Sequence, residues 1–301
     1  MYDVVIVGGG PAGLTAATYV RRAGKSVLVI EKDGFGGQIA WSPRVENFPG
    51  FVSISGAELG DRFLQQAMEQ GAEVELEEVS EITGTVGDRT VKCLSGAEFK
   101  ARTVIIAAGA KPRMLGLSGE EALVGNGVCF CAVCDGIFYK DKPVAVAGGG
   151  NSALQDAMLL SEKCSKVYLI HRRDSFRGET KLVEALRKKD NVEFILNSAI
   201  KALNGDTELR SLLLRTPEGE RELQVSGLFV AVGHKPDIAA FSPLMALDDG
   251  GYADSDESCT TMSPDIFAAG DCRRKKVHQL TTAVADGAAA ALAACEYIDS
   301  L

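Results

Sequence analysis

Two apolar runs in the chain are each followed by three consecutive glycines and a helical stretch. The runs lie in DVVIVGGGPAG (3–13) and PVAVAGGGNSA (143–153), and the stretches after them read LTAATYVRRAG and LQDAMLLSEKC. A second apolar run comes next in both places: SVLVIE ends at Glu31, and KVYLIH ends at His171, 140 positions later. Short apolar runs that alternate with helical patterns predict βαβ units with a parallel sheet. The sequence therefore contains two copies of one α/β unit.

The glycines of each copy are spaced as in the fingerprint of dinucleotide-binding folds. Such glycines permit a tight turn and a close approach of the backbone to a pyrophosphate at the helix N-terminus. The first copy reads Gly8-x-Gly10-x-x-Gly13, and the second reads Gly148-x-Gly150-x-x-Ala153. Two glycine-rich turns that bind no nucleotide are the plainer alternative. We expect an α/β protein with two Rossmann-like, three-layer ββα dinucleotide-binding domains.

The ends of the second strands predict different nucleotides for the two copies. Glu31 lies 23 positions after Gly8, where an acidic side chain accepts hydrogen bonds from ribose hydroxyls. The second copy has HRRDSFR (171–177) at this place, without an acid at the strand end. Its arginines are suited to a ribose 2′-phosphate, although a solvated basic face is the alternative: Arg172, Arg173 and Arg177. We expect a dinucleotide such as FAD in the first copy and NADPH in the second.

Two further stretches look like strands that leave a finished domain through a Lys-Pro linker, at 103–113 and 228–237. The chain after the second linker carries no third fingerprint, so we expect it to complete the first domain. The predicted division is an FAD-binding domain made of 1–113 and 241–301, with an NADPH-binding domain, 114–240, inserted in it. Two short linkers that cross side by side would form a hinge.

The C-terminal part predicts further contacts with a flavin. SPDIFAAGD (263–271) reads as a strand that reaches a Gly-Asp turn, and residues 279–298 read as an alanine-rich helix. The Asp271 carboxylate could accept a hydrogen bond from a ribityl hydroxyl. The amides near Leu280 and Thr281 would place the positive end of the helix near the isoalloxazine. The alternative is a capped helix that binds no ligand.

Composition narrows the classes of function. The formal charge of −9 argues against nucleic acid as a partner, because such binding requires dense Lys and Arg. A strand pattern begins at Tyr2 and leaves no room for a signal peptide, and the most apolar late stretch is too short to span a membrane. We therefore expect a cytoplasmic protein without a membrane segment, in which dispersed cysteines stay reduced.

Three cysteines stand within six positions in CFCAVCDG (129–136). Structural zinc needs four ligands, whereas this segment supplies at most three and the chain has no second CxxC, so we expect no metal. We interpret Cys129 as a packed thiol. A CxxC pair on a turn or helix start brings its sulfurs within bonding reach, so Cys131 and Cys134 are predicted to form a redox pair. Asp135, the next residue, is a candidate proton carrier.

The chain resembles the bacterial-type, low-molecular-weight thioredoxin reductases over nearly its whole length. The motifs that carry the resemblance are GGGPAG, GGQ (36–38), VENFPGF (45–51), AAG (107–109), CAVCDG, GGGNSA, HRRDSFR, VGHKPD (232–237) and the AAGD…TTAVADG tail. CAVCDG inside an NADPH unit is the specific one, because related flavoproteins place their CxxC in the first domain.

The resemblance implies a homodimeric, NADPH-dependent thioredoxin-disulfide reductase that uses FAD. It implies that electrons pass from NADPH to FAD and then to the disulfide through Cys134, with Asp135 protonating the departing thiolate and the NADPH domain rotating between two positions. Cys131 then attacks the disulfide of a thioredoxin or thioredoxin-like protein. Residues 137–139 match the apolar stretch that receives this partner, and simple core packing is the alternative for them.

The motifs, taken with the residues inferred above, give the expected cofactor contacts. For FAD these are Gly8, Gly10, Pro11, Ala12, Gly13, Glu31, Gly37, Gln38, Asn47, Ala108, Gly109, Gly270, Asp271, His278, Gln279 and Leu280. For NADPH these are Gly148, Gly150, Asn151, Ser152, Ala153, His171, Arg172, Arg173, Arg177 and Gly233.

Two features leave alternatives open. The family commonly has Arg-Gln after the Gly-Asp turn, where this chain has His278-Gln279, so the arginine contact near the flavin is absent or replaced by imidazole. RRKK (273–276) either compensates for this loss or faces solvent. The alternative function is a related flavin-dependent dithiol oxidoreductase that uses a ferredoxin-type donor or a small-molecule disulfide.

Overall fold

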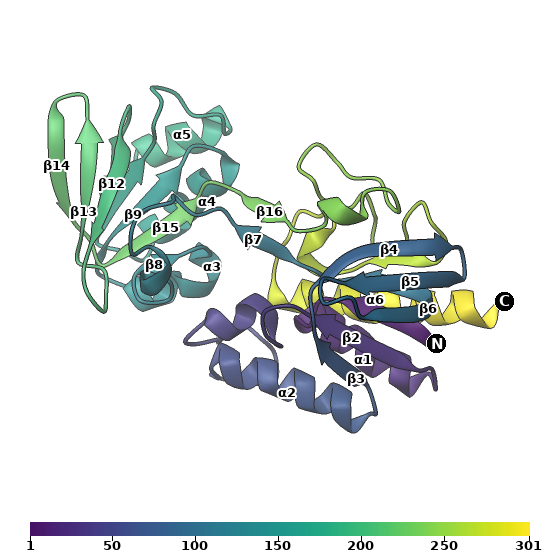
Figure 1. Cartoon of the computed structure of the whole chain (residues 1–301). Coiled ribbons are helices and arrows are strands. Elements are labelled where there is room, and N and C mark those ends of the chain that lie inside the picture. Colours follow the sequence, from purple (N-terminus) through teal and green to yellow (C-terminus); the bar gives the residue numbers. More distant parts are fainter. The chain divides into compact units, whose positions relative to one another are not determined.

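The computed structural model describes residues 1–301 and divides the chain into two compact units (Figure 1). Unit 1 consists of Met1–Lys111 and Lys235–Leu301. Unit 2 consists of Pro112–His234 and is inserted in the sequence of unit 1. Each unit has its own sheets and its own buried clusters.

Unit 1 is built on a seven-stranded sheet with the order β3-β2-β1-β6-β5-β4, in which β17 also pairs with β6. The strands are β1 (Tyr2–Val7), β2 (Val27–Glu31), β3 (Glu73–Leu76), β4 (Val79–Thr85), β5 (Asp88–Cys93), β6 (Glu98–Ile106) and β17 (Ile266–Ala268). Strands β3, β2, β1, β6 and β17 pair in parallel, whereas β4, β5 and β6 pair antiparallel. The C-terminal segment therefore completes the sheet that the N-terminal segment begins.

Alternate residues of β1 point into two different layers of unit 1. Val4 and Ile6 are buried in a cluster with residues of the helices, whereas Val5 and Val7 are buried in a cluster with residues of β4 and β5. The helices are α1 (Pro11–Arg22), α2 (Gly56–Glu69) and α6 (Leu280–Asp299). A parallel strand that is covered on both faces is apolar at every position, which explains the continuous run in the sequence.

Unit 2 repeats this plan with a parallel five-stranded sheet, β11-β10-β9-β15-β8, and an antiparallel sheet, β12-β13-β14. The strands are β8 (Val128–Cys129), β9 (Pro143–Gly148), β10 (Lys166–Ile170), β11 (Val192–Ile195), β12 (Ala199–Asn204), β13 (Ser211–Thr216), β14 (Gly219–Gln224) and β15 (Gly227–Ala231). The helices are α3 (Ala132–Asp135), α4 (Asn151–Ser161) and α5 (Thr180–Arg187). One buried cluster lies between the parallel sheet and the helices. A second buried cluster lies between the parallel sheet and the strands β13 and β14. The predicted fold class, two Rossmann-like three-layer ββα domains with one inserted in the other, is confirmed.

The two connections between the units pair with each other as the short strands β7 (Ala110–Pro112) and β16 (His234–Pro236). Residues 235–240 were expected in the inserted domain, but they belong to unit 1. The physical reason is that Ile238 is fully buried in the core of unit 1 beneath β4 and β5.

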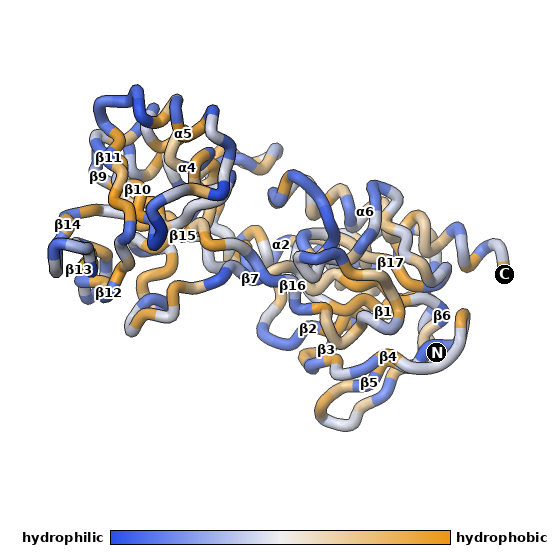
Figure 2. Tube along the Cα trace, turned by 90° about the horizontal axis from the view of Figure 1, so that it is seen from above, coloured by the Kyte–Doolittle hydropathy of each residue, from blue (hydrophilic) through white to orange (hydrophobic).

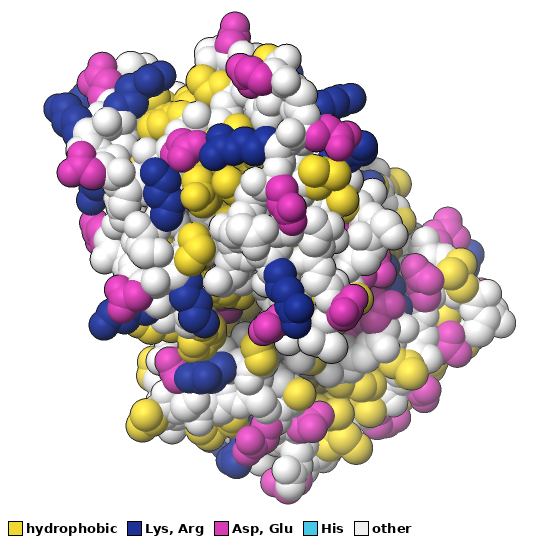
Figure 3. Space-filling view, turned by 90° about the vertical axis from the view of Figure 1, so that its left-hand side faces the viewer, with side chains coloured by type: hydrophobic (Ala, Val, Ile, Leu, Met, Phe, Trp, Pro, Cys, Tyr) yellow, Lys and Arg dark blue, Asp and Glu magenta, His cyan; other side chains and the backbone are white.

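Polar and apolar positions follow this layering along the backbone. Figure 2 shows the central strands of unit 2, β9, β10 and β15, largely in the apolar colour, and their residues form the buried core. The face drawn in Figure 3 carries cationic and anionic side chains interspersed with apolar ones.

Short 3₁₀ helices complete the fold: η1 (Gly37–Trp41), η2 (Glu121–Leu123), η3 (Gly136–Tyr139), η4 (Ala239–Phe241) and η5 (Gly270–Cys272). None of the helices combines the length and the apolar character needed to cross a bilayer.

Candidate active site

The glycine turn between β1 and α1 combines crowded positions with an open one. Gly8 has a φ of +111°, and a Cβ on it would lie 2.4 Å from the carbonyl oxygen of Ala107. A Cβ on Gly13 would lie 1.9 Å from the carbonyl oxygen of Gly8. Gly10, the N-cap of α1, is open, because a Cβ there would meet nothing closer than Gly37 Cα at 3.9 Å. The turn therefore leaves room for a phosphate at the α1 N-terminus, as a bound FAD requires.

Glu31, at the end of β2, holds this turn from the side. Its Oε2 accepts a hydrogen bond from the Gly9 amide at 2.6 Å, and its Oε1 accepts one from the Asp33 amide at 2.9 Å. A carboxylate oxygen has two lone pairs, so each oxygen keeps one acceptor site. The side chain is thus fixed in place and can still accept a hydrogen bond from a ribose hydroxyl.

Segments that are far apart in the sequence meet near this turn. Gln38 Nε2 donates a hydrogen bond to the carbonyl oxygen of Ala110 at 2.8 Å, and a Cβ on Gly109 would lie 3.8 Å from the same Nε2. Asn47 Nδ2 lies 3.4 Å from Gln279 Oε1. The structure thus joins the expected flavin contacts of the η1 region to the β6 exit and to the start of α6.

The Gly-Asp turn after β17 forms the 3₁₀ helix η5, and Asp271 lies in its middle. One carboxylate oxygen of Asp271, Oδ1, lies 3.1 Å from Lys275 Nζ, while about a third of its side chain stays exposed. Helix α6 begins directly after Gln279, which forms a capping box with Thr282. The cap fixes the direction of the first turn of α6, whose amides were expected near the flavin.

Side-chain burial alternates along the RRKK segment (273–276), which was not predicted from the sequence. The side chains of Arg273 and Lys275 are buried. Those of Arg274 and Lys276 are exposed. The two buried cations meet Asp286 of α6. Successive side chains of an extended segment point to opposite sides, and this period of two was the signal that could have revealed the inward pair. The His278 ring packs 5.7 Å from that of Tyr252.

The second glycine turn, between β9 and α4, repeats the design of the first. A Cβ on Gly148 would lie 2.4 Å from the carbonyl oxygen of Ala231, and a Cβ on Gly149 would lie 2.1 Å from the His171 ring. Gly150, the N-cap of α4, has open space where a Cβ would stand. Unit 2 therefore also leaves its helix N-terminus accessible to a phosphate.

The loop after β10 carries the arginines expected to bind a 2′-phosphate. All three have exposed side chains: Arg172, Arg173 and Arg177. His171, which precedes them, is buried and stacks on Phe176 with ring centroids 5.2 Å apart. Burial, reinforced by the neighbouring arginines, lowers the pKa of His171, so its ring is neutral near pH 7.

Two contacts fasten the arginine loop to the second glycine turn. The Arg177 amide donates a hydrogen bond to the carbonyl oxygen of Gly149 at 2.8 Å. Asn151 Oδ1 accepts from the Glu179 amide at 2.7 Å, and Asn151 Nδ2 donates to Glu179 Oε1 at 3.2 Å. Asn151, an expected NADPH contact, thus uses its side chain to hold the loop, a role that sequence reasoning missed.

The remaining expected contacts differ in exposure. Ala12 and Ala153 are buried, so their side chains pack inside the units and only their backbone could face a ligand. Ser152 is exposed in the first turn of α4. Gly233 has a φ of +108°, and its carbonyl oxygen accepts a hydrogen bond from the Arg113 amide at 2.9 Å.

Cys131 and Cys134 form a disulfide across the first turn of α3. Cys131 is the N-cap of this helix, and its Sγ accepts a hydrogen bond from the Cys134 amide at 3.1 Å. Both cysteines are partly exposed, and Val133 between them is 60% exposed. The pair therefore lies at the surface of unit 2.

Asp135 follows Cys134 as the last residue of α3, and its amide donates a hydrogen bond to the carbonyl oxygen of Cys131 at 2.9 Å. Burial of its carboxyl group raises the pKa of Asp135 to about 6. A carboxyl group with this pKa exists in both protonation states near neutral pH. It can therefore release a proton to a thiolate and recover it from solvent.

Cys129 differs from its two neighbours in being a buried thiol. Burial raises the pKa of Cys129 to about 12, so it is unreactive at neutral pH. Its Sγ lies 3.3 Å from the Tyr139 hydroxyl, and the Tyr139 ring packs edge-on against Phe229. Tyr139 is thus part of the core, and of the three residues expected to receive a partner only Ile137 is well exposed, at 46%.

Comparisons with known proteins agree with this arrangement. The family model described as pyridine nucleotide-disulphide oxidoreductase matches residues 2–287. The chain is 42% identical to a thioredoxin reductase of Listeria monocytogenes, covering 100% of this chain and 95% of that protein. It is 40% identical to a thioredoxin reductase of Bacillus subtilis, covering 100% and 96%.

A crystal structure of thioredoxin reductase from Streptococcus pyogenes matches with a TM-score of 0.95 and 38% identity over 100% of this chain and 99% of that chain. Proteins of this kind are flavoprotein oxidoreductases that use FAD and NADPH. The chain belongs to the thioredoxin reductase family of the pyridine nucleotide-disulphide oxidoreductases.

Proposed function

We propose that this enzyme passes two electrons from NADPH, through FAD, to the Cys131–Cys134 disulfide and then to the disulfide of a thioredoxin or thioredoxin-like protein. NADPH supplies a hydride, and FAD relays its two electrons to a disulfide. The observation that carries the proposal is the surface disulfide of α3, which lies in the unit that also holds the second glycine turn and the arginine loop.

Each unit is assigned one cofactor. Unit 1 would hold FAD with the open N-terminus of α1, the carboxylates of Glu31 and Asp271, and the side chains of Gln38 and Asn47. Unit 2 would hold NADPH with the open N-terminus of α4 and its arginine loop. The two turns support this assignment because both leave space only where a phosphate must approach.

The residues around the disulfide have separate roles in the chemistry. Reduction through Cys134 breaks the sulfur–sulfur bond, so Cys131 leaves as a thiolate and takes a proton from Asp135. Once Cys131 has released this proton to solvent and is again a thiolate, it attacks a partner disulfide, forming a mixed disulfide and releasing one partner thiolate. Cys134 then attacks the Cys131 sulfur, which releases the second partner thiolate and restores the intramolecular disulfide.

We also infer a cytoplasmic homodimer, as in the family that the sequence resembles. A hinge between the units is supported by the pairing of β7 with β16, which places the two connections next to each other. Analytical ultracentrifugation of the FAD-loaded protein checks the dimer, for which we expect twice the chain mass of 31.8 kDa.

The test replaces Cys134 by Ser and follows two half-reactions. NADPH-dependent bleaching of the flavin is expected to remain, because it needs no dithiol, whereas reduction of a thioredoxin should fall by about 10³-fold or more, because the nucleophilic pair is lost. Val133→Ser, in the same turn, is the matched control and should keep both reactions. Loss of both reactions in Cys134→Ser would show that the dithiol assignment is wrong.

A further inference from the structure

A group of four charged side chains lies beneath the start of α6, and only one of them, Asp271, has a role in the function proposed above. Its members are Asp271, Arg273, Lys275 and Asp286. The side chains of Arg273 and Lys275 are only 5% and 6% exposed, whereas that of Arg274 between them is 61% exposed. Burying two cations without partners is very costly, so their inward direction requires the carboxylates that they meet.

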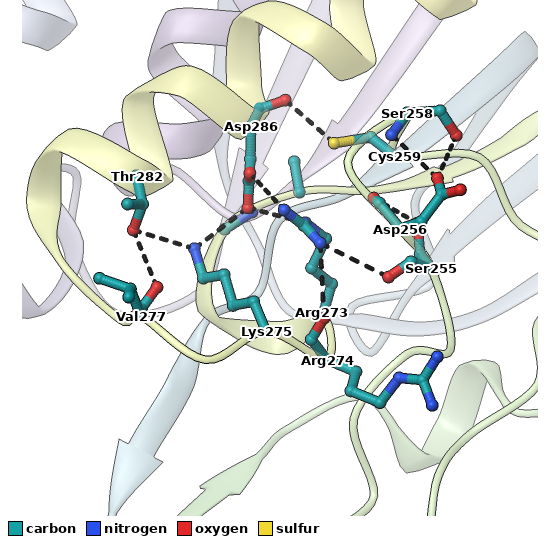
Figure 4. A network of polar contacts seen from close by, with 12 residues as sticks. Ser255, Asp256, Ser258, Cys259, Arg273, Arg274, Lys275, Val277, Thr282 and Asp286 are labelled. Carbon is teal, nitrogen blue, oxygen red and sulfur yellow. Dashed lines mark hydrogen bonds and ion pairs between the residues drawn. The ribbon is translucent and has the colours of Figure 1, made fainter.

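Asp286 of α6 is the centre of this group, as Figure 4 shows. Its Oδ2 accepts from the Gly270 amide at 3.0 Å and from Arg273 Nε at 3.0 Å, and its Oδ1 accepts from Arg273 Nη2 at 2.9 Å. Lys275 Nζ donates to the same Oδ2 at 3.1 Å. This paired arrangement ties η5 and the RRKK segment to α6.

Lys275 links this group to two parts of the proposed flavin site, Asp271 and the first turn of α6. Its Nζ lies 3.1 Å from Asp271 Oδ1, as an ion pair, and 3.4 Å from the Thr282 hydroxyl of the α6 capping box. One ammonium thus contacts the η5 carboxylate, the helix cap and Asp286. The partly exposed Asp271 side chain is held at one oxygen, so its other oxygen stays available to a ligand hydroxyl.

We propose that Lys275 is a positioning residue for FAD, which holds the Asp271 carboxylate and the first turn of α6 in the geometry that the flavin chain requires, with Asp286 and Arg273 fixing Lys275 in turn. The proposal rests on the assignment of Asp271 to FAD made above. It gives RRKK a structural meaning: two of its cations serve the interior of unit 1, and two face solvent.

The charges explain why a neutral side chain cannot replace this lysine. The group holds two carboxylates and two cations, so its charges balance, and all but Asp271 are almost fully buried. Without Lys275, Arg273 still neutralises Asp286, but Asp271 loses its counter-ion and becomes free to rotate. This rotation removes a well-placed acceptor for a ribityl hydroxyl.

The experiment measures FAD binding to apoprotein by quenching of flavin fluorescence, so it does not depend on turnover. Lys275→Gln is expected to raise the Kd for FAD about ten- to hundredfold, the size of a lost charge-assisted contact. The midpoint potential of the bound FAD is expected to become more negative, because a positive charge is lost near it. Lys276→Gln, an exposed lysine of the same segment, is the matched control and should change neither quantity.

The outcomes separate this inference from the proposed function. A Kd within about twofold of wild type, or an unchanged midpoint potential, in folded Lys275→Gln would overturn the positioning role. If Asp271→Asn weakens FAD binding in that case, the assignment of Asp271 survives; if Asp271→Asn also leaves the Kd unchanged, that assignment fails too. Should Lys275→Gln not fold, Lys275→Arg serves instead, because a planar fork cannot reach three separate acceptors as an ammonium does. It should raise the Kd at least about threefold, and an unchanged Kd would again contradict the proposal.

Discussion

At the scale of single residues, three cysteines that lie within six positions have different environments. Cys131 and Cys134 are partly exposed and bonded to each other at a helix N-terminus, whereas Cys129 is buried against Tyr139. Reactivity of a thiol depends on its thiolate fraction and its access, so only the first two suit exchange with another protein. Asp135 shares their turn and has the raised pKa that proton transfer to a thiolate needs.

The raised pKa of Asp135, about 6, also predicts a dependence of stability on pH. The folded protein holds the proton more tightly than the unfolded chain, so the free energy of unfolding falls as the pH rises from about 4 to about 6 and then stays level. Asp135→Asn removes this effect and should be stabilised relative to wild type by about 3 kcal/mol above pH 6, with little difference near pH 4. Urea unfolding across this range checks it, with exposed Asp174→Asn as control. A difference that does not change with pH would contradict the burial argument.

The exposed arginines predict the choice between the two nicotinamide nucleotides. Replacing Arg172 and Arg173 together by Ala should raise the KM for NADPH about ten- to hundredfold, because charge-assisted hydrogen bonds to the 2′-phosphate are lost. The KM for NADH should stay within about twofold, since NADH lacks that phosphate. Lys181→Ala, an exposed cation in α5, is the control. Equal losses with both nucleotides would place the 2′-phosphate elsewhere.

At the scale of elements, the two strand–turn–helix segments follow the same rule. The glycines that precede each helix N-cap are required by packing, because a Cβ on them would collide with backbone or with a side-chain ring. The glycine at each helix N-cap faces open space. The helix N-termini are therefore exposed to ligands while the turns around them are tightly packed. The fingerprint spacing records both requirements at once.

This contrast predicts opposite effects for two neighbouring substitutions in unit 2. Gly149→Ala would push a Cβ to 2.1 Å from the His171 ring, so it should lower the free energy of unfolding by about 2 kcal/mol or more. Gly150→Ala meets no protein atom and should leave stability unchanged. It should raise the KM for NADPH about tenfold or more, because the backbone can no longer approach the pyrophosphate closely. Thermal unfolding and initial rates distinguish the two variants. A destabilised Gly150→Ala would contradict the interpretation that a Cβ at this position meets open space.

At the scale of the whole molecule, unit 2 has a core of its own, whereas the core and sheet of unit 1 are built from both ends of the chain. Residues from α6 share one buried cluster with α1, and β17 pairs with β6. Unit 2 buries its apolar residues within Pro112–His234. The two units therefore differ in what they need in order to fold.

Fragments of the chain test this difference. A fragment of residues 112–234 is expected to fold cooperatively and to bind NADP⁺, because its core and arginine loop lie within it. A fragment of residues 1–111 should stay largely unfolded, because it lacks the α6 residues that fill the cluster around α1. Circular dichroism and NADP⁺ titration provide the measurements. A cooperative unfolding transition in the fragment of residues 1–111 would show that α6 is dispensable for its folding.

The sequence by itself determined the fold class, the duplication, the two glycine turns and the CxxC pair. These features depend on residues close together in the chain, where period and spacing act directly on local backbone geometry. Only the tertiary structure decided that Arg273 and Lys275 turn inward, that Tyr139 belongs to the core, that Asn151 holds the arginine loop and that residues 235–240 join unit 1. Each of these outcomes depends on contacts with another element of the fold, because the free energy of burying a side chain is set by what it meets there.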